Sequence, residues 1–351
     1  MAGLTAARRR LRPTGWSEAW VAGAFVTPAA LVILLIVAYP LVRALWLSVH
    51  DIVLTRPGEE PFVGLANYAS ELTSPDFWAA VWRSLGFTVA STAIELVLGV
   101  ALALLMDQPL RLRWLLRSLV ILPWALPTIV NALMWRWIDN AEYGALNALL
   151  TQTGLIGSYQ QWLSNPSTAM WMVVIADAWK MTPLVAILVL AALQGINREQ
   201  IEAARVDGAG TISTFRYVVL PLLTPTLLIV LVLRTMEAFK VFDIIWIMTN
   251  GGPANETQSI AIFAYQTAYR GYDFGRGSAL GYLIALAIML LAAVYLRLLG
   301  RVGRSGDEPE SPSPAPTSPA GNPALRLHAR RLRGDPRPLC LAAHQQRREA
   351  R

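Results

Sequence analysis

The sequence contains very little cysteine and histidine. Cys340 is the single cysteine, so no disulfide can form within the chain. The three histidines, His50, His328 and His344, are scattered along the sequence and do not have the spacing of a histidine-based metal site. These absences disfavour a disulfide scaffold and a histidine-dependent metalloenzyme.

Lysine and charged residues in general are also scarce. The only lysines are Lys180 and Lys240, and neither follows a glycine, so the sequence contains no glycine-lysine P-loop. If ATP drives the protein, another polypeptide must bind the nucleotide. Charged residues make up 15% and hydrophobic residues 55% of the chain, which disfavours a soluble domain.

Long apolar runs account for this composition, and they are typical of transmembrane helices. We expect an all-α integral membrane protein with six transmembrane helices. The first run begins at Trp20 and continues past Val42, which is too long for a cleaved signal peptide. The third run is interrupted by Pro123 and Pro127. The later spans are expected at residues 84–106, 115–138, 169–193, 220–249 and 278–299.

The arginines predict the orientation of these spans. They concentrate before the first span, near residues 110 and 205, and after the last span. With six spans all four regions fall on one side, and the positive-inside rule makes that side cytoplasmic. We therefore expect a multi-pass plasma-membrane protein with both termini in the cytoplasm. The formal charge of +7 is explained by topology and does not indicate nucleic-acid binding.

Three regions are expected along the chain. Residues 1–18 are a cytoplasmic tail, residues 19–300 the transmembrane domain, and residues 301–351 a tail rich in proline, serine and arginine. The composition of the C-terminal tail predicts disorder. Its arginines are suited to contact anionic membrane lipid, with an uninvolved tail as the alternative.

Residues 197–221 form a polar interval between two apolar runs. Asn197 is expected to cap a short helix, with Gln200 reaching back to it. Gly208 and Gly210 are expected to end this helix, and Thr211 to cap a second one. The pattern predicts helix, glycine turn and helix at a membrane surface. A surface loop without a docking role remains an alternative.

The spacing of this interval resembles the cytoplasmic EAA loop of ABC-importer permeases. The matching pattern is Glu202-Ala203-Ala204, then Gly208, then Val218 two residues before Leu220-Pro221, with valine in place of the family's isoleucine. The resemblance implies that the loop docks into a cleft on a separate ATPase subunit. The coupling residues that it implies are Glu202, Ala203, Ala204, Asp207, Gly208, Leu220 and Pro221.

Three further stretches narrow the resemblance. FVGLANY at residues 62–68, LPWALP at 122–127 and TNGGP at 249–253 are similar to the maltose, trehalose and glycerol-phosphate type permeases. This resemblance implies the type I ABC-importer permease fold and a sugar or polyol substrate. It also implies three partners: a second homologous permease subunit, ABC ATPase subunits and an extracytoplasmic solute-binding protein. ATP would be bound and hydrolysed by the partner, so no cofactor and no covalent chemistry are expected in this chain.

Charged residues within the expected spans are costly and indicate function or pairing. Asp177 and Lys180 are spaced to pair with each other. Between residues 234 and 243, charges of alternating sign recur every three residues, and they either pair or line a pathway. Aromatic rings and polar groups together suit a sugar. The expected pathway residues are Asn131, Trp135, Trp179, Lys180, Glu237, Phe239, Lys240 and Asp243.

Two alternatives to an importer permease remain from the sequence alone. A stand-alone secondary transporter for a small polar solute would favour repeated halves and an ion-coupling carboxylate, and the sequence shows neither clearly. A membrane enzyme would need a nucleophile motif, a metal cluster or a catalytic triad, and the sequence contains no such pattern, so no enzymatic activity is expected.

Overall fold

The computed structural model describes residues 18–56 and 58–304, and these residues are mainly helical. Pairing of extended backbone among them is limited to two isolated bridges, His50 with Phe62 and Val53 with Asp273. Most of the two expected tails, residues 1–18 and 301–351, lies outside the described residues. The all-α expectation is confirmed for the described part of the chain.

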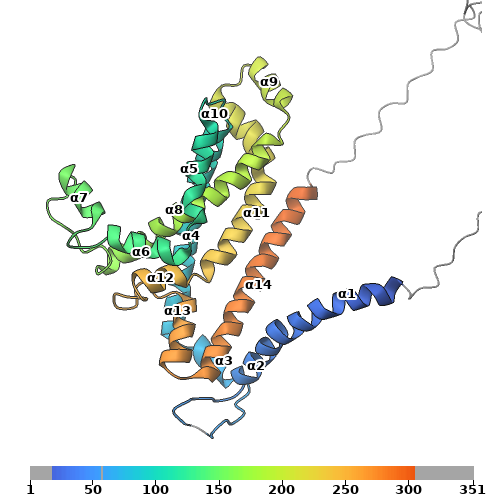
Figure 1. Cartoon of the computed structure of the whole chain (residues 1–351), viewed down its shortest axis with the longest axis vertical. Helices are drawn as coiled ribbons and strands as arrows, with labels where there is room; N and C mark the ends of the chain where they lie inside the picture. Colours follow the sequence, from blue (N-terminus) through green and yellow to red (C-terminus); the bar gives the residue numbers. More distant parts are fainter. Residues whose placement is uncertain (1–17, 57, 305–351) are drawn as a thin grey trace, which may run out of the picture. The chain divides into compact units, whose positions relative to one another are not determined.

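The helices follow one another with short connections (Figure 1). In chain order they are α1 Glu18–Ile33, η1 Leu34–Ala38, α2 Tyr39–Ser48, α3 Ala66–Leu72, α4 Pro75–Asp107, α5 Arg113–Ala125, α6 Thr128–Ile138, α7 Ala145–Gln152, α8 Pro166–Gln194, α9 Arg198–Val206, α10 Thr211–Thr214, η2 Phe215–Val219, α11 Leu220–Phe239, α12 Asp243–Met248, α13 Ile260–Tyr265, η3 Gln266–Arg270 and α14 Phe274–Arg304. The η elements are single π-helical stretches that continue directly from α-helices.

Five helical segments within residues 18–56 and 58–304 are long and apolar enough to cross a membrane. A sixth span is present if α5 and α6 are counted together, although the two are bent by 94°. Leu126 is extended because it precedes Pro127, and a residue before proline is disfavoured in the helical region. The six-span expectation is therefore met with a broken third span. The five continuous segments are Ala22–Ser48, Pro75–Asp107, Pro166–Gln194, Thr211–Phe239 and Phe274–Arg297.

The fifth span differs from its expected bounds of 220–249. It begins earlier, because α10, η2 and α11 form one continuous segment, and it ends at Phe239. The chain leaves the helix at Lys240, and α12 starts at Asp243. The break is stabilised from another segment, because Ser259 Oγ donates to the Val241 carbonyl at 2.7 Å. A sharp turn therefore separates the charged residues that the sequence placed on one helix.

Helices α4 and α14 extend toward the end where α3 and α13 lie, whereas α8 and α11 run from the level of α6 and α12 toward α9 and α10 (Figure 1). Helix α4 packs extensively on α8. At their contact, a Cβ on Gly99 would lie 2.5 Å from Val185 Cγ1, so a small residue is needed there. Thr235 of α11 and Tyr295 of α14 share a hydrogen bond of 3.0 Å.

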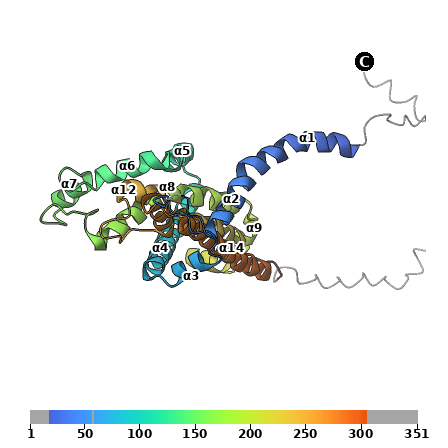
Figure 2. The same cartoon turned by 90° about the horizontal axis from the view of Figure 1, so that it is seen from below.

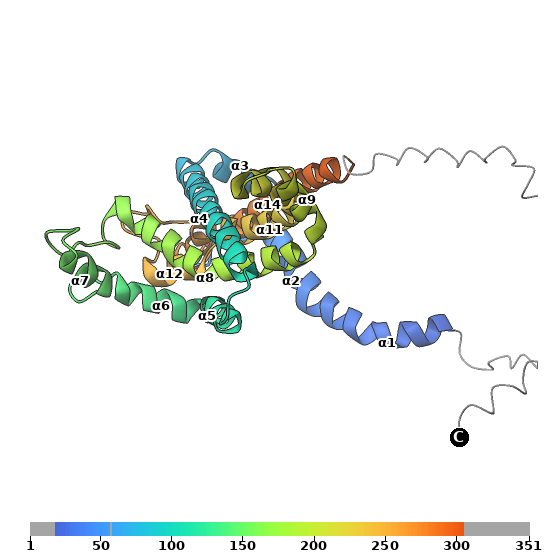
Figure 3. The same cartoon turned by 90° about the horizontal axis from the view of Figure 1, so that it is seen from above.

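Helix α1 has a different environment. It extends away from α4, α8, α11 and α14 (Figures 2 and 3). The described side chains from Ala22 to Leu35 are exposed, and most are apolar. Such a surface is compatible with lipid contact, as expected for a first span. The same views show α5, α6 and α7 following one another along one edge of the helices.

Candidate functional site

The interval between the fourth and fifth spans forms the expected helix, turn and helix. Asn197 caps α9, since its Oδ1 accepts from the Glu199 amide at 3.0 Å. The residue that reaches back is Glu199, whose carboxylate accepts from Asn197 Nδ2 at 3.2 Å. The side chain of Gln200 forms no hydrogen bond with other described residues, so its expected role in this cap is wrong.

The turn after α9 depends on one glycine. Gly208 has a φ of +88°, a conformation that side chains disfavour. Gly210 has a φ of −70° and is itself the N-terminal cap of α10. Thr211 forms no capping hydrogen bond and is the first helical residue, so its expected capping role is wrong. Leu220 and Pro221 continue the helix from η2 into α11.

Most of the residues expected to couple to an ATPase are accessible. Glu202, Ala203, Asp207 and Gly208 are exposed, and Ala204 is partly buried. Large apolar side chains beside them are also exposed: Val206, Ile212 and Tyr217. Exposed apolar side chains gathered in one segment are typical of a contact surface.

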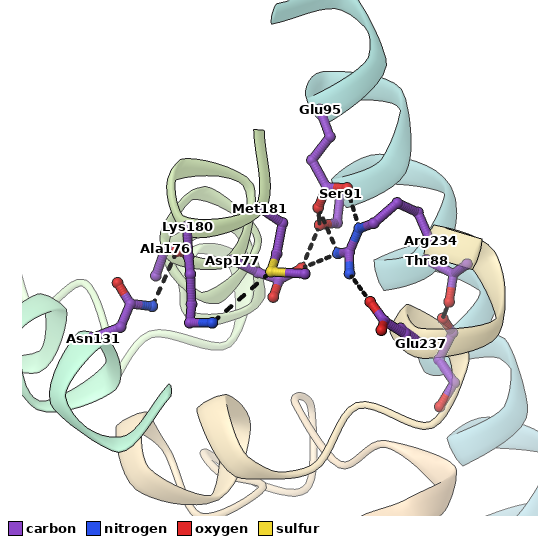
Figure 4. Close-up of polar contacts among 11 residues, drawn as sticks. Thr88, Ser91, Glu95, Asn131, Ala176, Asp177, Lys180, Met181, Arg234 and Glu237 are labelled. Carbon is purple, nitrogen blue, oxygen red and sulfur yellow. Dashed lines mark hydrogen bonds and ion pairs between the residues drawn. The ribbon is translucent and has the colours of Figure 1, made fainter. Parts of the chain in front are cut away.

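A buried arginine joins three of the long helices (Figure 4). Arg234 of α11 donates to both carboxylate oxygens of Glu95 on α4, at 2.5 and 2.7 Å. It also donates to Asp177 of α8 at 3.1 Å and to Glu237 at 2.8 Å. Ser91 Oγ lies 2.7 Å from an oxygen of Glu95 and 2.7 Å from one of Asp177. We call these five residues the arginine cluster.

The arginine cluster is largely withdrawn from solvent. The side chains of Arg234 and Glu95 are 3% and 0% exposed, whereas Glu237 is 56% exposed. A buried charge is tolerated when it is paired and hydrogen-bonded, and the bidentate contact with Glu95 meets that condition. The cluster therefore ends in one accessible carboxylate, that of Glu237.

A cavity of about 390 Å³ lies beside the accessible edge of the arginine cluster. We call it the charged cavity. Both hydrogen-bond acceptors and donors line it. Its polar lining residues are Thr128, Asp177, Lys180, Arg234, Glu237, Lys240 and Asp243.

Four of the eight expected pathway residues therefore lie together at the charged cavity: Lys180, Glu237, Lys240 and Asp243. Their pairing differs from the sequence-based expectation. Asp177 pairs with Arg234 instead of Lys180, because a guanidinium on the facing helix reaches it. Glu237 also pairs with Arg234. Among the described residues, neither Lys180 nor Lys240 forms an ion pair, and Lys180 Nζ approaches Met181 Sδ at 4.0 Å.

The other four expected residues lie elsewhere. Phe239 is buried in an apolar cluster with Phe77, Ile260 and Leu280, on the face of α11 about 200° away from Glu237. Asn131 is buried and donates to the Ala176 carbonyl at 3.3 Å, which joins α6 to α8. These two side chains support packing and do not line the charged cavity.

The remaining pair is aromatic. Trp135 of α6 and Trp179 of α8 meet edge to face, with ring centroids 6.1 Å apart. Neither ring lines the charged cavity. The Nε1 group of Trp135 is buried and has no hydrogen-bond partner among the described residues.

Glu95 and Ser91 are not predicted from the sequence as site residues, and Arg234 is not predicted as the centre of a cluster. Glu95 lies in the middle of the second apolar run, where a lone carboxylate is a signal of function. The partner of such a carboxylate cannot be read from one helix, because Arg234 is 139 residues away in sequence.

Two more buried carboxylates lie outside the membrane-spanning segments. Glu71 of α3 accepts from Arg276 Nε of α14 at 2.6 Å, and burial nevertheless raises the pKa of Glu71. Asp139 follows α6, is 1% exposed, and neither of its oxygens has a hydrogen-bond partner in the described part of the chain. Burial raises the pKa of Asp139 to about 7. No group of three or more His, Cys, Asp or Glu side chains suited to a metal ion occurs among the described residues.

Residues 95–305 match the family described as the binding-protein-dependent transport system inner membrane component. The chain is 38% identical to the trehalose/maltose transport system permease protein of Thermococcus litoralis over 82% of this chain and 96% of that protein. It is 35% identical to the sulfoquinovosyl glycerol permease protein of Agrobacterium fabrum, over 78% of this chain and 88% of that one. The chain therefore belongs to the inner-membrane permeases of binding-protein-dependent transport systems, and it is a multi-pass membrane protein.

A further relative and a solved structure agree with this assignment. The trehalose transport system permease protein of Mycobacterium tuberculosis is 34% identical over 83% of this chain and 92% of that protein. The fold is similar to that of a chain in a bacterial ABC transporter for the import of alginate, with a TM-score of 0.70. That likeness covers 80% of this chain and 96% of the other at 20% identity, and it establishes the fold of an ABC-importer permease.

Proposed function

We propose that this chain is the permease subunit through which an ATP-driven importer passes a sugar or polyol. The observation that carries the proposal is the charged cavity. It presents carboxylates and ammonium groups together, and a sugar hydroxyl both donates and accepts hydrogen bonds. Two relatives are named as permeases for trehalose or maltose, which supports a carbohydrate substrate.

The arginine cluster gives the charged cavity a defined shape. Arg234 orients Asp177 and Glu237, and its contact with Glu95 holds the guanidinium in place. Lys180 and Lys240 supply donors from α8 and the end of α11. Preoriented acceptors and donors bind a ligand with less loss of side-chain entropy than mobile ones.

Coupling to ATP is assigned to residues 197–221. Glu202, Asp207 and the exposed apolar side chains around Gly208 would enter a cleft on an ATPase subunit. Helix α9 lies next to the start of the fifth span, and α11 carries Arg234 and Glu237, so movement of the loop would reach the charged cavity through one helix. Alternating access follows if this movement opens and closes the cavity on opposite sides of the membrane.

The proposed assembly contains ABC ATPase subunits, a second homologous permease subunit and an extracytoplasmic solute-binding protein. ATP is bound and hydrolysed by the ATPase, and this chain itself performs no covalent chemistry. Both termini and residues 197–221 face the cytoplasm, as the distribution of arginines favours.

The test is uptake of labelled trehalose, maltose and glycerol phosphate into vesicles that contain the assembled complex. We expect uptake of at least one of them that requires ATP, the ATPase subunit and the binding protein. Uptake by this chain alone under a proton or sodium gradient would contradict the proposal and support a secondary transporter. If the complex takes up none of the three labelled compounds when ATP is present, the proposed substrate class is wrong.

A further inference from the structure

Five aromatic side chains between residue 242 and the start of α14 form a continuous series of ring contacts. We call them the aromatic row, and they are Phe242, Trp246, Tyr265, Tyr269 and Phe274. The ring centroids of Phe242 and Tyr265 are 5.2 Å apart, those of Tyr265 and Tyr269 are 4.9 Å apart, and those of Tyr269 and Phe274 are 5.6 Å apart. Trp246 stacks on Phe242 at 5.5 Å and meets Tyr265 at 4.9 Å.

Four rings of the aromatic row, all except that of Trp246, line a groove of about 520 Å³. Small residues form much of the remaining lining, among them Ala261, Ala264 and Ala268. Small neighbours leave the larger rings accessible, and Tyr269 is 58% exposed. The hydroxyl groups of Tyr265 and Tyr269 form no hydrogen bond with other described residues, so they are available to a ligand.

The groove and the charged cavity share one lining residue. Phe242 lines both, and it follows the break at the end of α11 directly. From Phe242 the row leads away from the charged cavity along α13 and η3 to Phe274. The row therefore provides a connected series of rings that begins at the site assigned to the sugar.

The chemistry of the row suits one face of a sugar ring. A pyranose has faces of C–H groups, and these are attracted to the electron-rich face of an aromatic ring. Stacking has little directional requirement, so a sugar can shift from one ring to the next without breaking a network of hydrogen bonds. Arg270 lies over Trp246, with Cζ 4.9 Å from the ring centroid, and donates to Asn250 at 3.2 Å. Its guanidinium therefore covers Trp246, and the exposed tyrosines remain the accessible rings.

We propose that the aromatic row is a second saccharide-binding surface, which receives the sugar before it enters the charged cavity. This inference rests on the proposed function as a sugar permease. The row stacks against the sugar, and the charged cavity then binds its hydroxyls. The expected effect of the row is on the rate of delivery, since the external binding protein captures the sugar first.

The experiment compares Tyr265→Leu and Tyr269→Leu with the wild type in vesicles that contain the full complex and labelled maltose or trehalose. Leucine keeps an apolar side chain and removes the ring. We expect the maximal rate of uptake, normalised to protein in the membrane, to fall by about threefold to tenfold in each variant. The half-saturating sugar concentration should stay close to the wild-type value.

Three further variants separate ring stacking from other roles. Tyr265→Phe and Tyr269→Phe keep the ring and should retain most of the uptake. Tyr272→Leu is the matched control, because Tyr272 is an exposed tyrosine in the same segment that forms no ring contact with other described residues. It should transport at the wild-type rate.

Each other outcome contradicts the inference. Wild-type rates in both leucine variants would show that the row is not used. Equal losses in the phenylalanine variants would assign the effect to the hydroxyls, and an equal loss in Tyr272→Leu would assign it to a membrane-interface role. Vesicles of the wild type without ATP-dependent uptake would instead contradict the proposed function.

Discussion

Arg234 is the residue on which three helices depend, since it contacts carboxylates from α4, α8 and α11. Arg234→Met would leave Glu95 buried without its charge partner. We expect a loss of about 3–5 kcal/mol in the free energy of unfolding, together with the loss of uptake. Thermal unfolding of the purified protein in detergent measures the first effect.

A double variant supplies the control for this prediction. Adding Glu95→Leu to Arg234→Met removes the stranded carboxylate, so the pair of changes should cost less than the sum of the single changes. Strict additivity would show that the two side chains do not stabilise each other.

Asp139 predicts a dependence of stability on pH. Its pKa is raised from 3.8 to about 7 by burial, so the folded state favours the protonated form. The folded protein then holds more protons than the unfolded chain between these two values, and stability falls as the pH rises from about 4 to about 7. We expect the melting temperature of the wild type to fall between pH 5 and pH 8. The melting temperature of Asp139→Asn should fall less over the same range.

Glu142→Gln is the matched control for Asp139→Asn, because Glu142 is an exposed carboxylate in the same connection. It should retain the wild-type dependence on pH. If the melting temperatures of Asp139→Asn and the wild type change equally with pH, the prediction is wrong, and the carboxylate of Asp139 is solvated or paired.

At the scale of elements, the segment between α8 and α11 offers two neighbouring glycines with different requirements. Gly208 has a φ of +88° and Gly210 a φ of −70°, and a Cβ added to either residue would have no atom within 4 Å. Gly208→Val therefore strains the turn by about 1–3 kcal/mol, whereas Gly210→Val fits the existing backbone. Because the turn positions the proposed docking surface, Gly208→Val should lose uptake and co-purification of the ATPase.

Gly210→Val should retain uptake and co-purification of the ATPase. Glu202→Lys should lose both, because it reverses a charge on the proposed docking surface. All three proteins are compared at equal amounts in the membrane. Full uptake and ATPase association in Gly208→Val and Glu202→Lys would remove the docking role of this segment.

For the whole molecule, the orientation in the membrane is a prediction of the arginine distribution. In a Cys340→Ala background, Glu59→Cys and Gln152→Cys should react with a membrane-impermeant thiol reagent in intact cells, and Thr211→Cys should not. All three positions are exposed, so accessibility to the reagent depends on the side of the membrane. Asn147 is unsuitable, because it is buried and bonded to Asn140, Gln160 and Trp162. Equal reaction at Thr211→Cys and Glu59→Cys would contradict the six-span topology, because it would place both sites on the same side of the membrane.

Local sequence predicted most of the helices and spans of this protein and the helix-turn-helix at residues 197–221, although the fifth span ends earlier than expected. Apolar length predicts a membrane helix, and the backbone preferences of Asn197, Gly208 and Pro127 act within a few residues. The family resemblance also followed from local motifs, and the match over residues 95–305 confirms it.

The tertiary structure decided which side chains meet. Asp177 and Lys180 have the spacing of an intrahelical pair, yet Asp177 accepts a hydrogen bond from Arg234, which another helix supplies. Phe239 lies two residues from Glu237 on α11, about 200° around the helix. Its side chain is buried by apolar residues that come from other helices. The charged cavity and the aromatic row both depend on contacts between helices, and such contacts depend on how the helices are packed rather than on the residues adjacent in the chain.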